Sequence, residues 1–440
     1  MIKDLIIIGA GPGGYELALA AGKKGLDTLL IEKNKLGGTC LHHGCIPTKT
    51  YFHSAKILKE AKSFSDFGII GDFKFDFSKV KQKKAEVVSN LESGINFQFK
   101  KSNVQLVFGE AKLISDTEVL VNDEVYKGTN IVIATGSSPA KLNIQGINSK
   151  DVITSTELLD INTPPKKLVV IGGGVIGIEL ASIFNMFGSE VEVIEAQSEI
   201  LSVVDKEITK RLQTYLKTLG IKFYLNSKVL GLEGNEIYFE NKGEVKSSHF
   251  DKVLVAVGRR PNVDNLGLDE VGIIYSKHGI DVNDYFQTNI PNIYAIGDVT
   301  GKLMLAHSAT YMGYQVLSHI LGEDTRIDFN LNPSCIFTFP EVATVGLTEE
   351  EAKGLDYKVT KFLFKANGKA HSMGNTDGFL KLISCDDKIL GVHIIGPSAS
   401  ELIHEAVTLM SANVSIKDAK NIIFAHPTLS EVVSGTIIEI

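Results

Sequence analysis

The sequence predicts an α/β chain in which two similar strand–helix–strand units are followed by an α+β domain. The two units are predicted because an apolar run followed by a glycine-rich turn occurs near the N-terminus and again after residue 165. The α+β domain is predicted because strand-like and helix-like segments alternate after about residue 325 without a further glycine-rich turn.

Length and composition restrict the class of protein. A chain of 440 residues is expected to form about three domains. The formal net charge of -7 leaves no basic footprint, which argues against nucleic acid and against acidic membrane surfaces as partners. The apolar runs have strand length and the first strand begins at once, so no membrane span and no targeting segment are expected. Four cysteines do not form a disulfide framework, and a cytoplasmic location is expected.

The first unit has the pattern of a nucleotide-binding turn between two strands. Its parts in order are strand Leu5–Ile8, a turn with Gly9, Gly11 and Gly14, a helix that ends at Ala21, strand Thr28–Ile31, and Glu32. Such glycines allow a tight turn and let the backbone approach a pyrophosphate at the N-terminus of the helix. The acid after the second strand is placed to bind ribose hydroxyls.

The second unit repeats this pattern. Its parts are strand Leu168–Ile171, a turn with Gly172, Gly174 and Gly177, a helix that ends at Phe187, strand Glu190–Ile194, and Glu195. The separation from the first glycine to the terminal acid is 23 positions in both units. This repetition disfavours an accidental glycine turn in either unit, so two dinucleotides are predicted.

Further elements connect and follow the two units. A long amphipathic helix is predicted at Phe77–Phe99, and Pro164 and Pro165 mark the entry to the second unit. Strands that end in glycine are predicted at Ile131–Gly136, Val253–Gly258 and Asn292–Asp298. In the last domain the predicted strands are Val359–Phe364, Gly378–Ile383 and Ile389–Ile395, with helices at Glu349–Ala352 and Ala399–Met410.

The stretch Gly37–Lys49 carries the strongest chemical signal. Four residues separate Cys40 from Cys45, and on one helical turn this spacing would bring the two sulfurs close enough to bridge. Gly37 and Gly38 would let the backbone pass close to a bulky ligand. The pattern predicts a redox-active disulfide pressed against a cofactor.

Two alternatives exist for these cysteines: buried packing and a metal site. His42 and His43 lie between the cysteines, but no second ligand pair follows nearby, so no metal is predicted. A redox disulfide needs an electron acceptor beside it. Because the cysteines follow the first unit, that unit is assigned FAD and the second a nicotinamide.

Together with the preceding fingerprint and the following Pro47-Thr48-Lys49, this stretch resembles the active-site signature of the class I pyridine nucleotide-disulfide oxidoreductases, and the resemblance covers nearly the whole chain. It implies two Rossmann-like dinucleotide-binding domains plus a C-terminal α+β dimerisation domain. The expected divisions are an FAD-binding domain at 1–145, an NAD-binding domain at 146–268, a segment returning to the FAD domain at 269–324, and the dimerisation domain at 325–440.

A disulfide reached by thiolate attack requires a base, because a free thiol with a pKa of about 8.5 is mostly protonated at neutral pH. Histidine suits this role, and His426 is followed five residues later by Glu431, whose carboxylate can hold one ring nitrogen. A lone histidine before proline is more often a solvated loop residue. The segment His426-Pro-Thr-Leu-Ser-Glu431 matches the His–Glu pair of the family's dithiol enzymes, and this favours the catalytic role.

The resemblance also implies individual roles. Cys40 would exchange with substrate and Cys45 would face the flavin, while Lys49 would stabilise reduced flavin with Glu179 as its ion-pair partner. Asp298 would meet the ribityl chain of FAD. The other residues expected at the cofactors, beyond the two glycine turns and their acids, are Gly38, Thr39, Thr135, Gly136, Gly258, Gly297, Leu305, Ala306 and His307.

Cofactor and substrate follow from the same residues. An acid at position 195 without a nearby arginine binds ribose hydroxyls and repels a 2′-phosphate, so NAD is favoured over NADP. The resemblance implies a homodimer that oxidises a dithiol carried by a lipoyl-bearing protein. The alternatives are a reductase of glutathione or another small disulfide, a mercuric reductase, and a non-catalytic FAD-binding redox sensor. The chain departs from the family pattern at His42-His43, at Ser308–Tyr311, and in ending nine residues after Glu431.

Overall fold

The computed structural model describes residues 2–440, and internal contacts divide the chain into two compact units. Unit 1 comprises the residues up to Thr50 together with Ser78–Ala140 and Gly258–Ile327. Unit 2 comprises Tyr51–Phe77, Lys141–Val257 and Asp328–Ile440. The predicted boundaries at residues 145, 268 and 324 stay predictions.

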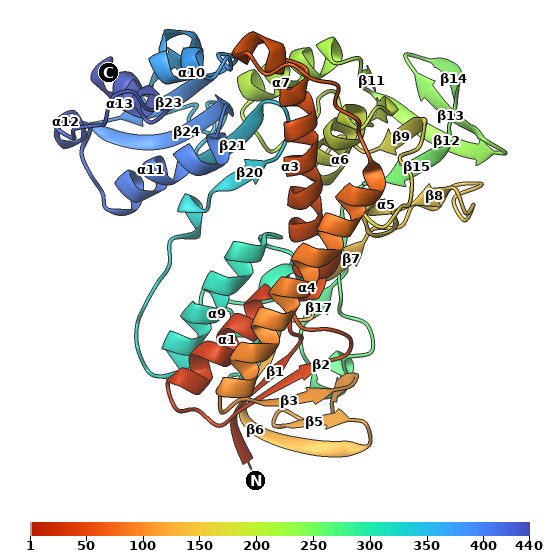
Figure 1. Ribbon diagram of the computed structural model, residues 1–440. Coiled ribbons are helices and arrows are strands. Elements are labelled where there is room, and N and C mark those ends of the chain that lie inside the picture. The colour runs from red at the N-terminus through yellow and green to blue at the C-terminus, as the bar shows by residue number, and fades with distance from the viewer. Residues whose placement is uncertain (1) are drawn as a thin grey trace. The chain divides into compact units, whose positions relative to one another are not determined.

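Unit 1 is built on a seven-stranded sheet in the order β3-β2-β1-β6-β5-β4, with β19 beside β6. Its strands are β1 (Ile2–Ile8), β2 (Thr28–Glu32), β3 (Gln105–Phe108), β4 (Ala111–Leu113), β5 (Glu118–Val121), β6 (Glu124–Ile133) and β19 (Ile293–Ala295). Its main helices are α1 (Pro12–Lys23), α4 (Phe77–Lys101), which begins at the last residue of a unit 2 segment, and α9 (Ala306–Ile320). Strands β1, β2, β3, β6 and β19 pair in parallel, and α1 and α9 lie side by side (Figure 1).

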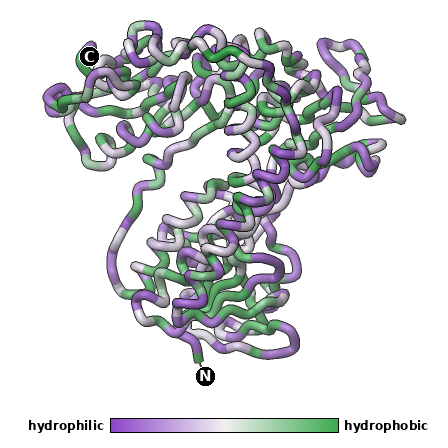
Figure 2. The backbone as a smooth tube through the Cα atoms, in the orientation of Figure 1, coloured by the Kyte–Doolittle hydropathy of each residue, from purple (hydrophilic) through white to green (hydrophobic). Residues whose placement is uncertain are grey.

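Apolar strands explain why this sheet forms the core of unit 1. Leu5, Ile6 and Ile7 of β1 are fully buried, as are Leu29 and Leu30 of β2. Strands of a parallel sheet that are buried on both faces are near-continuous apolar runs, as these are. Figure 2 shows the strands of this sheet in the colour of hydrophobic residues.

Unit 2 contains a second parallel sheet in the order β11-β10-β9-β15-β8. Its strands are β8 (Val152–Ile153), β9 (Lys167–Ile171), β10 (Glu190–Ile194), β11 (Lys222–Tyr224) and β15 (Lys252–Val255), with helices α6 (Val175–Met186) and α7 (Lys206–Thr218). A separate antiparallel ladder is formed by β12 (Ser227–Glu233), β13 (Glu236–Asn241) and β14 (Glu244–His249). The second predicted βαβ unit is therefore present.

The rest of unit 2 is an antiparallel sheet in the order β20-β21-β24-β23-β22. Its elements are β20 (Ser334–Ile336), β21 (Glu341–Gly346), β22 (Lys358–Leu363), α10 (Gly368–Ser372), β23 (Phe379–Cys385), β24 (Lys388–Gly396), α11 (Ala399–Ser411), α12 (Ile416–Ala419) and α13 (Glu431–Ile438). Helices α11 and α13 share one hydrophobic core with the sheet. One Rossmann-like sheet lies in unit 1 and a second in unit 2, and the C-terminal part of unit 2 is α+β. The predicted fold class is therefore confirmed.

Some predicted elements differ from the structure. The prediction of a helix at Glu349–Ala352 is wrong, because this stretch is a turn. The carboxylate of Glu351 accepts hydrogen bonds there from the N–H and the hydroxyl of Thr348. The strands predicted at Ile131–Gly136 and Val253–Gly258 end earlier, at Ile133 and Val255, and their last residues form loops.

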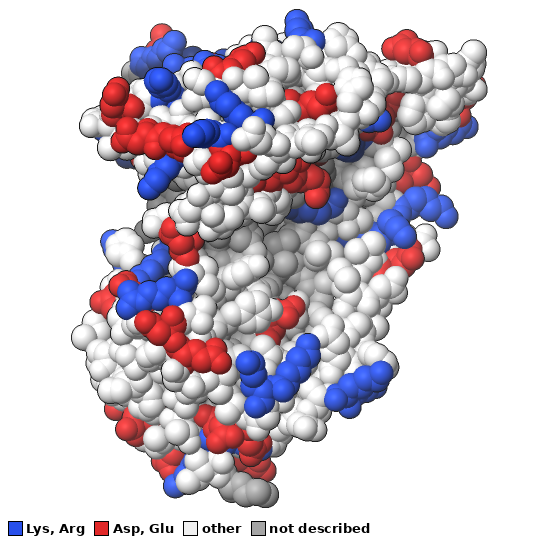
Figure 3. All heavy atoms as spheres, turned by 90° about the vertical axis from the view of Figure 1, so that its left-hand side faces the viewer, with Lys and Arg blue, Asp and Glu red and all other residues white. Residues whose placement is uncertain are grey.

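Surface charge and helix hydropathy test whether a basic surface or a membrane-spanning helix is present. On the face shown in Figure 3, acidic and basic side chains are interspersed, without one dominant basic field. Within residues 2–440, no helix combines the length and the apolar character that crossing a membrane requires.

A buried ionic cluster connects α7 to the C-terminal sheet within unit 2. Lys381 of β23 is 1% exposed, and its Nζ lies 3.0 Å from Oδ2 of Asp205, which is 2% exposed. Nζ also bonds to Glu349, and Asp205 caps α7 by accepting from the N–H of Glu207. Burial alone would raise the pKa of Asp205, but the hydrogen bond from Lys381 and its neighbours outweigh burial and hold it below the ordinary value.

Replacing Lys381 by methionine is expected to lower the free energy of unfolding by about 3–5 kcal/mol, because the carboxylate of Asp205 would stay buried without its cation. Since the folded pKa of Asp205 is depressed, its stabilising contribution is present above about pH 3.9, the unfolded value, and is lost as pH falls through the folded pKa. Chemical unfolding of both proteins at pH 7 and at decreasing pH measures the difference.

The matched control is Lys361→Met. The Nζ of Lys361 lies 2.7 Å from Oε1 of Glu207, but the side chain of Lys361 is 39% exposed. An exposed pair contributes about 0–1 kcal/mol, so this variant should unfold close to the unmodified protein. Equal losses for the two variants would contradict the stabilising role of the buried cluster.

Candidate active site

The first glycine turn lies at the carboxyl end of β1, where Gly9 and Gly14 leave no room for a side chain. A Cβ on Gly9 would lie 2.4 Å from the carbonyl oxygen of Ala134, and one on Gly14 would lie 1.9 Å from the carbonyl oxygen of Gly9. Gly9 also has φ +106°, which disfavours other residues. The turn is closed by Glu32, whose Oε2 accepts from the N–H of Ala10 at 2.7 Å.

The second glycine turn repeats these contacts. A Cβ on Gly172 would lie 2.4 Å from the carbonyl oxygen of Ala256, and one on Gly177 would lie 2.2 Å from that of Gly172. The carboxylate of Glu195 accepts from the N–H of Gly173 through Oε2 and from that of Gln197 at 2.6 Å through Oε1. Each terminal acid therefore holds its own turn.

Both turns have the features that a pyrophosphate requires. Gly11 and Gly174 are the N-cap residues of α1 and α6, and a Cβ on either would meet no protein atom within 4 Å. The backbone at each N-cap is therefore open on the side where a Cβ would lie, and the N-terminus of a helix attracts anions. The residues present fit one dinucleotide at each turn.

The stretch Gly37–Lys49, which carries the two cysteines, packs against the first glycine turn through its first residues. Helix α2 (Gly38–His43) begins after Gly37, which has φ +95° and donates its N–H to the carbonyl of Ala10 at 2.8 Å. A Cβ on Gly38 would lie 2.8 Å from the Cα of Gly11. The backbone contact places the residues after Gly38 next to the predicted FAD site, and Thr39 is exposed there.

The two cysteines do not share one helical turn, as the spacing had suggested. Helix α2 ends at His43. Its C-cap residue Gly44 has a φ of -143° and a ψ of -111°, which are not helical, and α3 (Cys45–Ala61) begins with the second cysteine. Glycine permits this break, so Cys40 lies on one helix and Cys45 starts the next. His42, between them, is tied to the carbonyl of Leu36 at 2.8 Å through Nε2.

The cysteine side chains are nevertheless in contact. The pKa of the Cys40 thiol is raised, first by its hydrogen bond with Cys45 and then by burial, while the charge of Lys49 acts in the opposite direction. Lys49 lies in the first part of α3, as predicted. A thiol with a raised pKa is a poor nucleophile without a base, so thiol exchange at this pair depends on proton transfer.

A polar group that the sequence analysis missed surrounds Asp298. The carboxylate of Asp298 accepts from the hydroxyl of Ser137, and its Oδ2 lies 3.7 Å from Nε of Arg259. Arg259 also donates to the hydroxyl and carbonyl oxygens of Ser137, each at 2.7 Å. Burial lowers the pKa of Arg259, partly offset by the charges of Asp298 and Cys45. The only sequence signal was that Arg259 follows the predicted strand-end Gly258.

The other residues expected at the cofactors lie in unit 1, on loops and at the start of α9. Thr135 and Gly136 follow β6, where the Thr135 hydroxyl donates to the carbonyl of Asn262 at 2.8 Å. Gly258 and Gly297 have φ of +116° and +71°. Leu305 is the N-cap of α9, so Ala306 and His307 form its first turn.

The predicted base lies in unit 2, before α13. Nδ1 of His426 lies 2.9 Å from Oε1 of Glu431, and Oε2 of Glu431 accepts from the N–H of Thr428 at 2.9 Å. The hydrogen bond with His426, followed by that from Thr428, lowers the pKa of Glu431. His426 has a side chain that is 77% exposed, so its other nitrogen can meet a substrate.

The structure thus assembles two partial sites. Unit 1 brings together the cysteines, Lys49, Asp298 and the first turn, whereas unit 2 holds Glu179, the second turn and the His426–Glu431 pair. Glu179 is 5% exposed and accepts from the N–H of Phe337 at 2.9 Å. Its pairing with Lys49 stays a prediction, as does the meeting of His426 with the cysteines.

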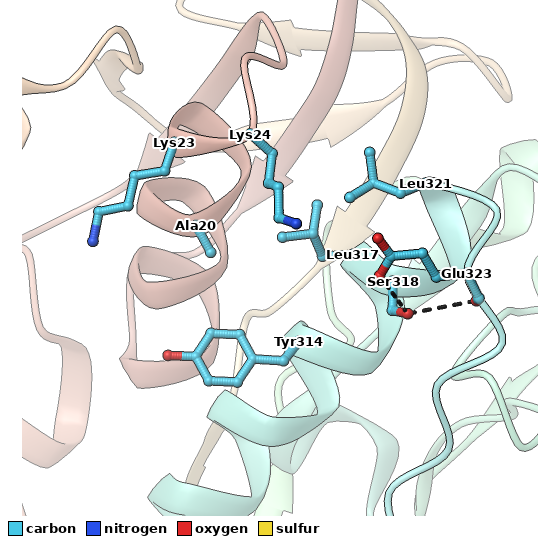
Figure 4. Close-up of a pocket in the computed structure, with 8 residues that line it drawn as sticks. All are labelled: Ala20, Lys23, Lys24, Tyr314, Leu317, Ser318, Leu321 and Glu323. Carbon is cyan, nitrogen blue, oxygen red and sulfur yellow. Dashed lines mark hydrogen bonds between the residues drawn. The ribbon is translucent and has the colours of Figure 1, made fainter.

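A separate cavity of about 370 Å³ opens in unit 1 between the C-terminal end of α1 and α9 (Figure 4). It is lined by Ala20, Lys23, Lys24, Tyr314, Leu317, Ser318, Leu321 and Glu323. None of these is a predicted site residue.

Comparison with known proteins shows the family. Residues 3–313 match the pyridine nucleotide-disulphide oxidoreductase family, and residues 332–436 match its dimerisation domain. The dihydrolipoyl dehydrogenase of Chlamydia muridarum is 42% identical, over 98% of this chain and 95% of the relative. That of Bacillus subtilis is 38% identical, over 97% of this chain and 96% of the relative.

Solved structures show the same architecture. The HOCl-induced flavoprotein disulfide reductase RclA from Escherichia coli is 30% identical, with a TM-score of 0.89 over 99% of both chains. The match in sequence and the match in fold both extend over nearly the whole chain. The chain belongs to the pyridine nucleotide-disulphide oxidoreductase family.

Proposed function

We propose that this chain oxidises protein-bound dihydrolipoamide to lipoamide and reduces NAD+ to NADH. The observation that carries the proposal is the contact between the Cys40 and Cys45 side chains beside the first glycine turn. The dihydrolipoyl dehydrogenases that share 38–42% identity over nearly the full length support the same activity. No observation favours a glutathione-type reductase or a redox sensor.

The chain's residues divide between two cofactors, FAD and NAD. FAD would be held by the first turn, Glu32 and Asp298, and NAD by the second turn and Glu195. Bound FAD supplies electron transfer between the cysteines and the nicotinamide, which protein side chains cannot perform. Lys49, with Glu179 as its proposed partner, would supply positive charge near the flavin.

The proposed base is prepared by its carboxylate partner. The hydrogen bond from Nδ1 to Glu431 leaves Nε2 of His426 as the proton acceptor. The lowered pKa of Glu431 keeps the carboxylate charged, so it stabilises the imidazolium after proton transfer.

Thiol exchange follows from this arrangement. His426 takes the proton from one substrate thiol, and the resulting thiolate attacks Sγ of Cys40, which breaks the Cys40–Cys45 disulfide and releases Cys45 as a thiolate. The second substrate thiol then attacks the mixed disulfide and its proton passes to the departing sulfur of Cys40, which breaks the bond to Cys40 and closes the cyclic disulfide of the product. Two electrons have passed from substrate to the cysteine pair. Their removal by NAD+ restores the disulfide.

The match to the family's dimerisation domain supports a homodimer. In the proposed dimer the base from one protomer serves the cysteines of its partner, which would make each site composite. The proposed substrate carrier is a lipoyl-bearing protein of a 2-oxoacid dehydrogenase, acetoin dehydrogenase or glycine cleavage system.

The reaction can be tested with free substrates. Purified enzyme is expected to oxidise dihydrolipoamide with NAD+ and to prefer NAD+ over NADP+ in kcat/KM, because Glu195 repels a 2′-phosphate. The double variant Glu195→Ala, Ala196→Arg should have a smaller ratio of kcat/KM for NAD+ to kcat/KM for NADP+. The single variant Ala196→Arg, which keeps Glu195, is the control. Enzyme that instead reduces glutathione disulfide with NADPH would overturn the assignment.

The roles of the two sulfurs predict opposite spectra. Cys40→Ser is expected to show a long-wavelength absorbance band without reductant, because Cys45 can no longer form its disulfide and its thiolate stays beside oxidised flavin. Cys45→Ser should never show this band. Visible absorbance spectra of both FAD-loaded variants test the assignment. The reverse pattern would mean that Cys40 faces the flavin and Cys45 exchanges with substrate.

The composite site predicts complementation between inactive chains. Cys40→Ser and His426→Ala homodimers are each expected to be nearly inactive with dihydrolipoamide, because each lacks one essential group at both sites. A heterodimer of the two rebuilds one complete site and should recover about half of the wild-type activity per dimer if the sites are independent.

The heterodimer must be isolated through two different affinity tags before assay. If His426 served the cysteines of its own chain, every site in this heterodimer would lack an essential group. A verified heterodimer without recovered activity would therefore rule out the shared site.

A further inference from the structure

The loop that carries His426 is fixed to the C-terminal part of unit 2 by one buried and one partly buried polar side chain. Asn367, which is 2% exposed, donates through Nδ2 to the carbonyl of Thr428 at 2.9 Å. Its Oδ1 accepts from the N–H of Ala370, so both ends of this amide are bonded. The Asn367 side chain, with both of its polar atoms hydrogen-bonded, therefore holds one side of the loop.

The other side of the loop is held by Glu405 of α11. The hydroxyl of Ser430 donates to Oε1 of Glu405 at 2.6 Å. Ser430 is the N-cap residue of α13 and directly precedes Glu431, whose carboxylate orients His426. A shift of Ser430 would thus move the start of α13 and the carboxylate that holds the imidazole.

The surroundings of Glu405 disfavour a charge on its carboxyl group. Its Oε2 is buried without a hydrogen-bond partner among residues 2–440, and no Lys, Arg or His in that range forms an ion pair with it. Burial raises the pKa of Glu405, and the single hydrogen bond from Ser430 only partly opposes this. A carboxylate oxygen that is buried without a partner makes the charged form costly, because the charge loses its solvation.

We propose that Glu405 is a positioning residue for the His426–Glu431 pair and that this role requires an acceptor oxygen rather than a negative charge. It holds Ser430, which sets where α13 begins, and so fixes Glu431 at hydrogen-bond distance from Nδ1 of His426. The hydroxyl of Ser430 needs only an oxygen that accepts its hydrogen bond, which a carboxyl group or an amide both provide. The catalytic consequence rests on the proposed role of His426 as the base.

Four FAD-loaded variants test the proposal: Glu405→Ala, Glu405→Gln, Ser430→Ala and the control Glu401→Ala. Glu401 lies one turn earlier on α11, carries the same side chain and is exposed. Three measurements are made on each: kcat for dihydrolipoamide oxidation across pH, the rate of flavin reduction by NADH, and the His426 Nδ1 to Glu431 Oε1 distance in a crystal structure.

Glu405→Ala and Ser430→Ala are expected to lower kcat by about 10–100-fold, as misplaced catalytic groups do, without changing flavin reduction by NADH. Their crystal structures should show the His426–Glu431 hydrogen bond lengthened or lost. Glu405→Gln should stay within about twofold of wild type with an unchanged pH profile, because its amide oxygen can accept from Ser430 and it is neutral. Glu401→Ala should match wild type in all three measurements.

Three results would overturn the inference. Loss of activity in Glu405→Gln equal to that in Glu405→Ala would mean that the charge is required. Equal slowing of flavin reduction would show a general structural defect, and an undisturbed His426–Glu431 bond in Glu405→Ala would remove the positioning role. A wild-type enzyme without dihydrolipoamide activity would instead refute the proposed function, while the crystal structures would still decide whether Glu405 positions the pair.

Discussion

Unit 1 depends on one close contact between two backbones. Gly38 lies against Gly11, and no side chain fits between them, since a Cβ on Gly38 would lie 2.8 Å from the Cα of its neighbour. The contact sets the distance between the redox cysteines and the first nucleotide turn through main-chain atoms. Side-chain rotation therefore cannot change it. The sulfur chemistry depends on this fixed backbone spacing.

The two nucleotide turns share a second constraint, which is a carboxylate bound to the turn itself. Glu32 and Glu195 each accept from an N–H of the residue after the first glycine. The acid thus stabilises its own turn, and its remaining lone pairs are available for the proposed contacts to ribose hydroxyls. A loop with exposed N–H groups needs such an internal anchor to keep one shape without ligand.

The sequence predicted what repeats or lies close together in the chain. Glycine spacing and terminal acids located both turns, and five-residue spacing located the His426–Glu431 pair. The sequence did not predict the contacts of Asp298 with Ser137 and Arg259, because these partners lie 161 and 39 positions away and have no shared local pattern. Helical spacing was misleading between the cysteines, where Gly44 interrupts the helix, and at residues 349–352, where local hydrogen bonds close a turn. Glu405 gave no signal because a glutamate on an amphipathic helix is normally solvated.

The order of strands in unit 1 has a consequence for synthesis on the ribosome. Strand β6 ends at Ile133 but pairs with β19, which begins at Ile293, about 160 residues later. At roughly 5–20 residues per second, β6 waits about 8–30 s for this neighbour. In that interval the parallel sheet of unit 2, from β8 to β15, has been synthesised in full. Unit 1 is therefore the first to begin folding but cannot be the first to finish, and its sheet, with six of its seven strands synthesised, must stay soluble meanwhile.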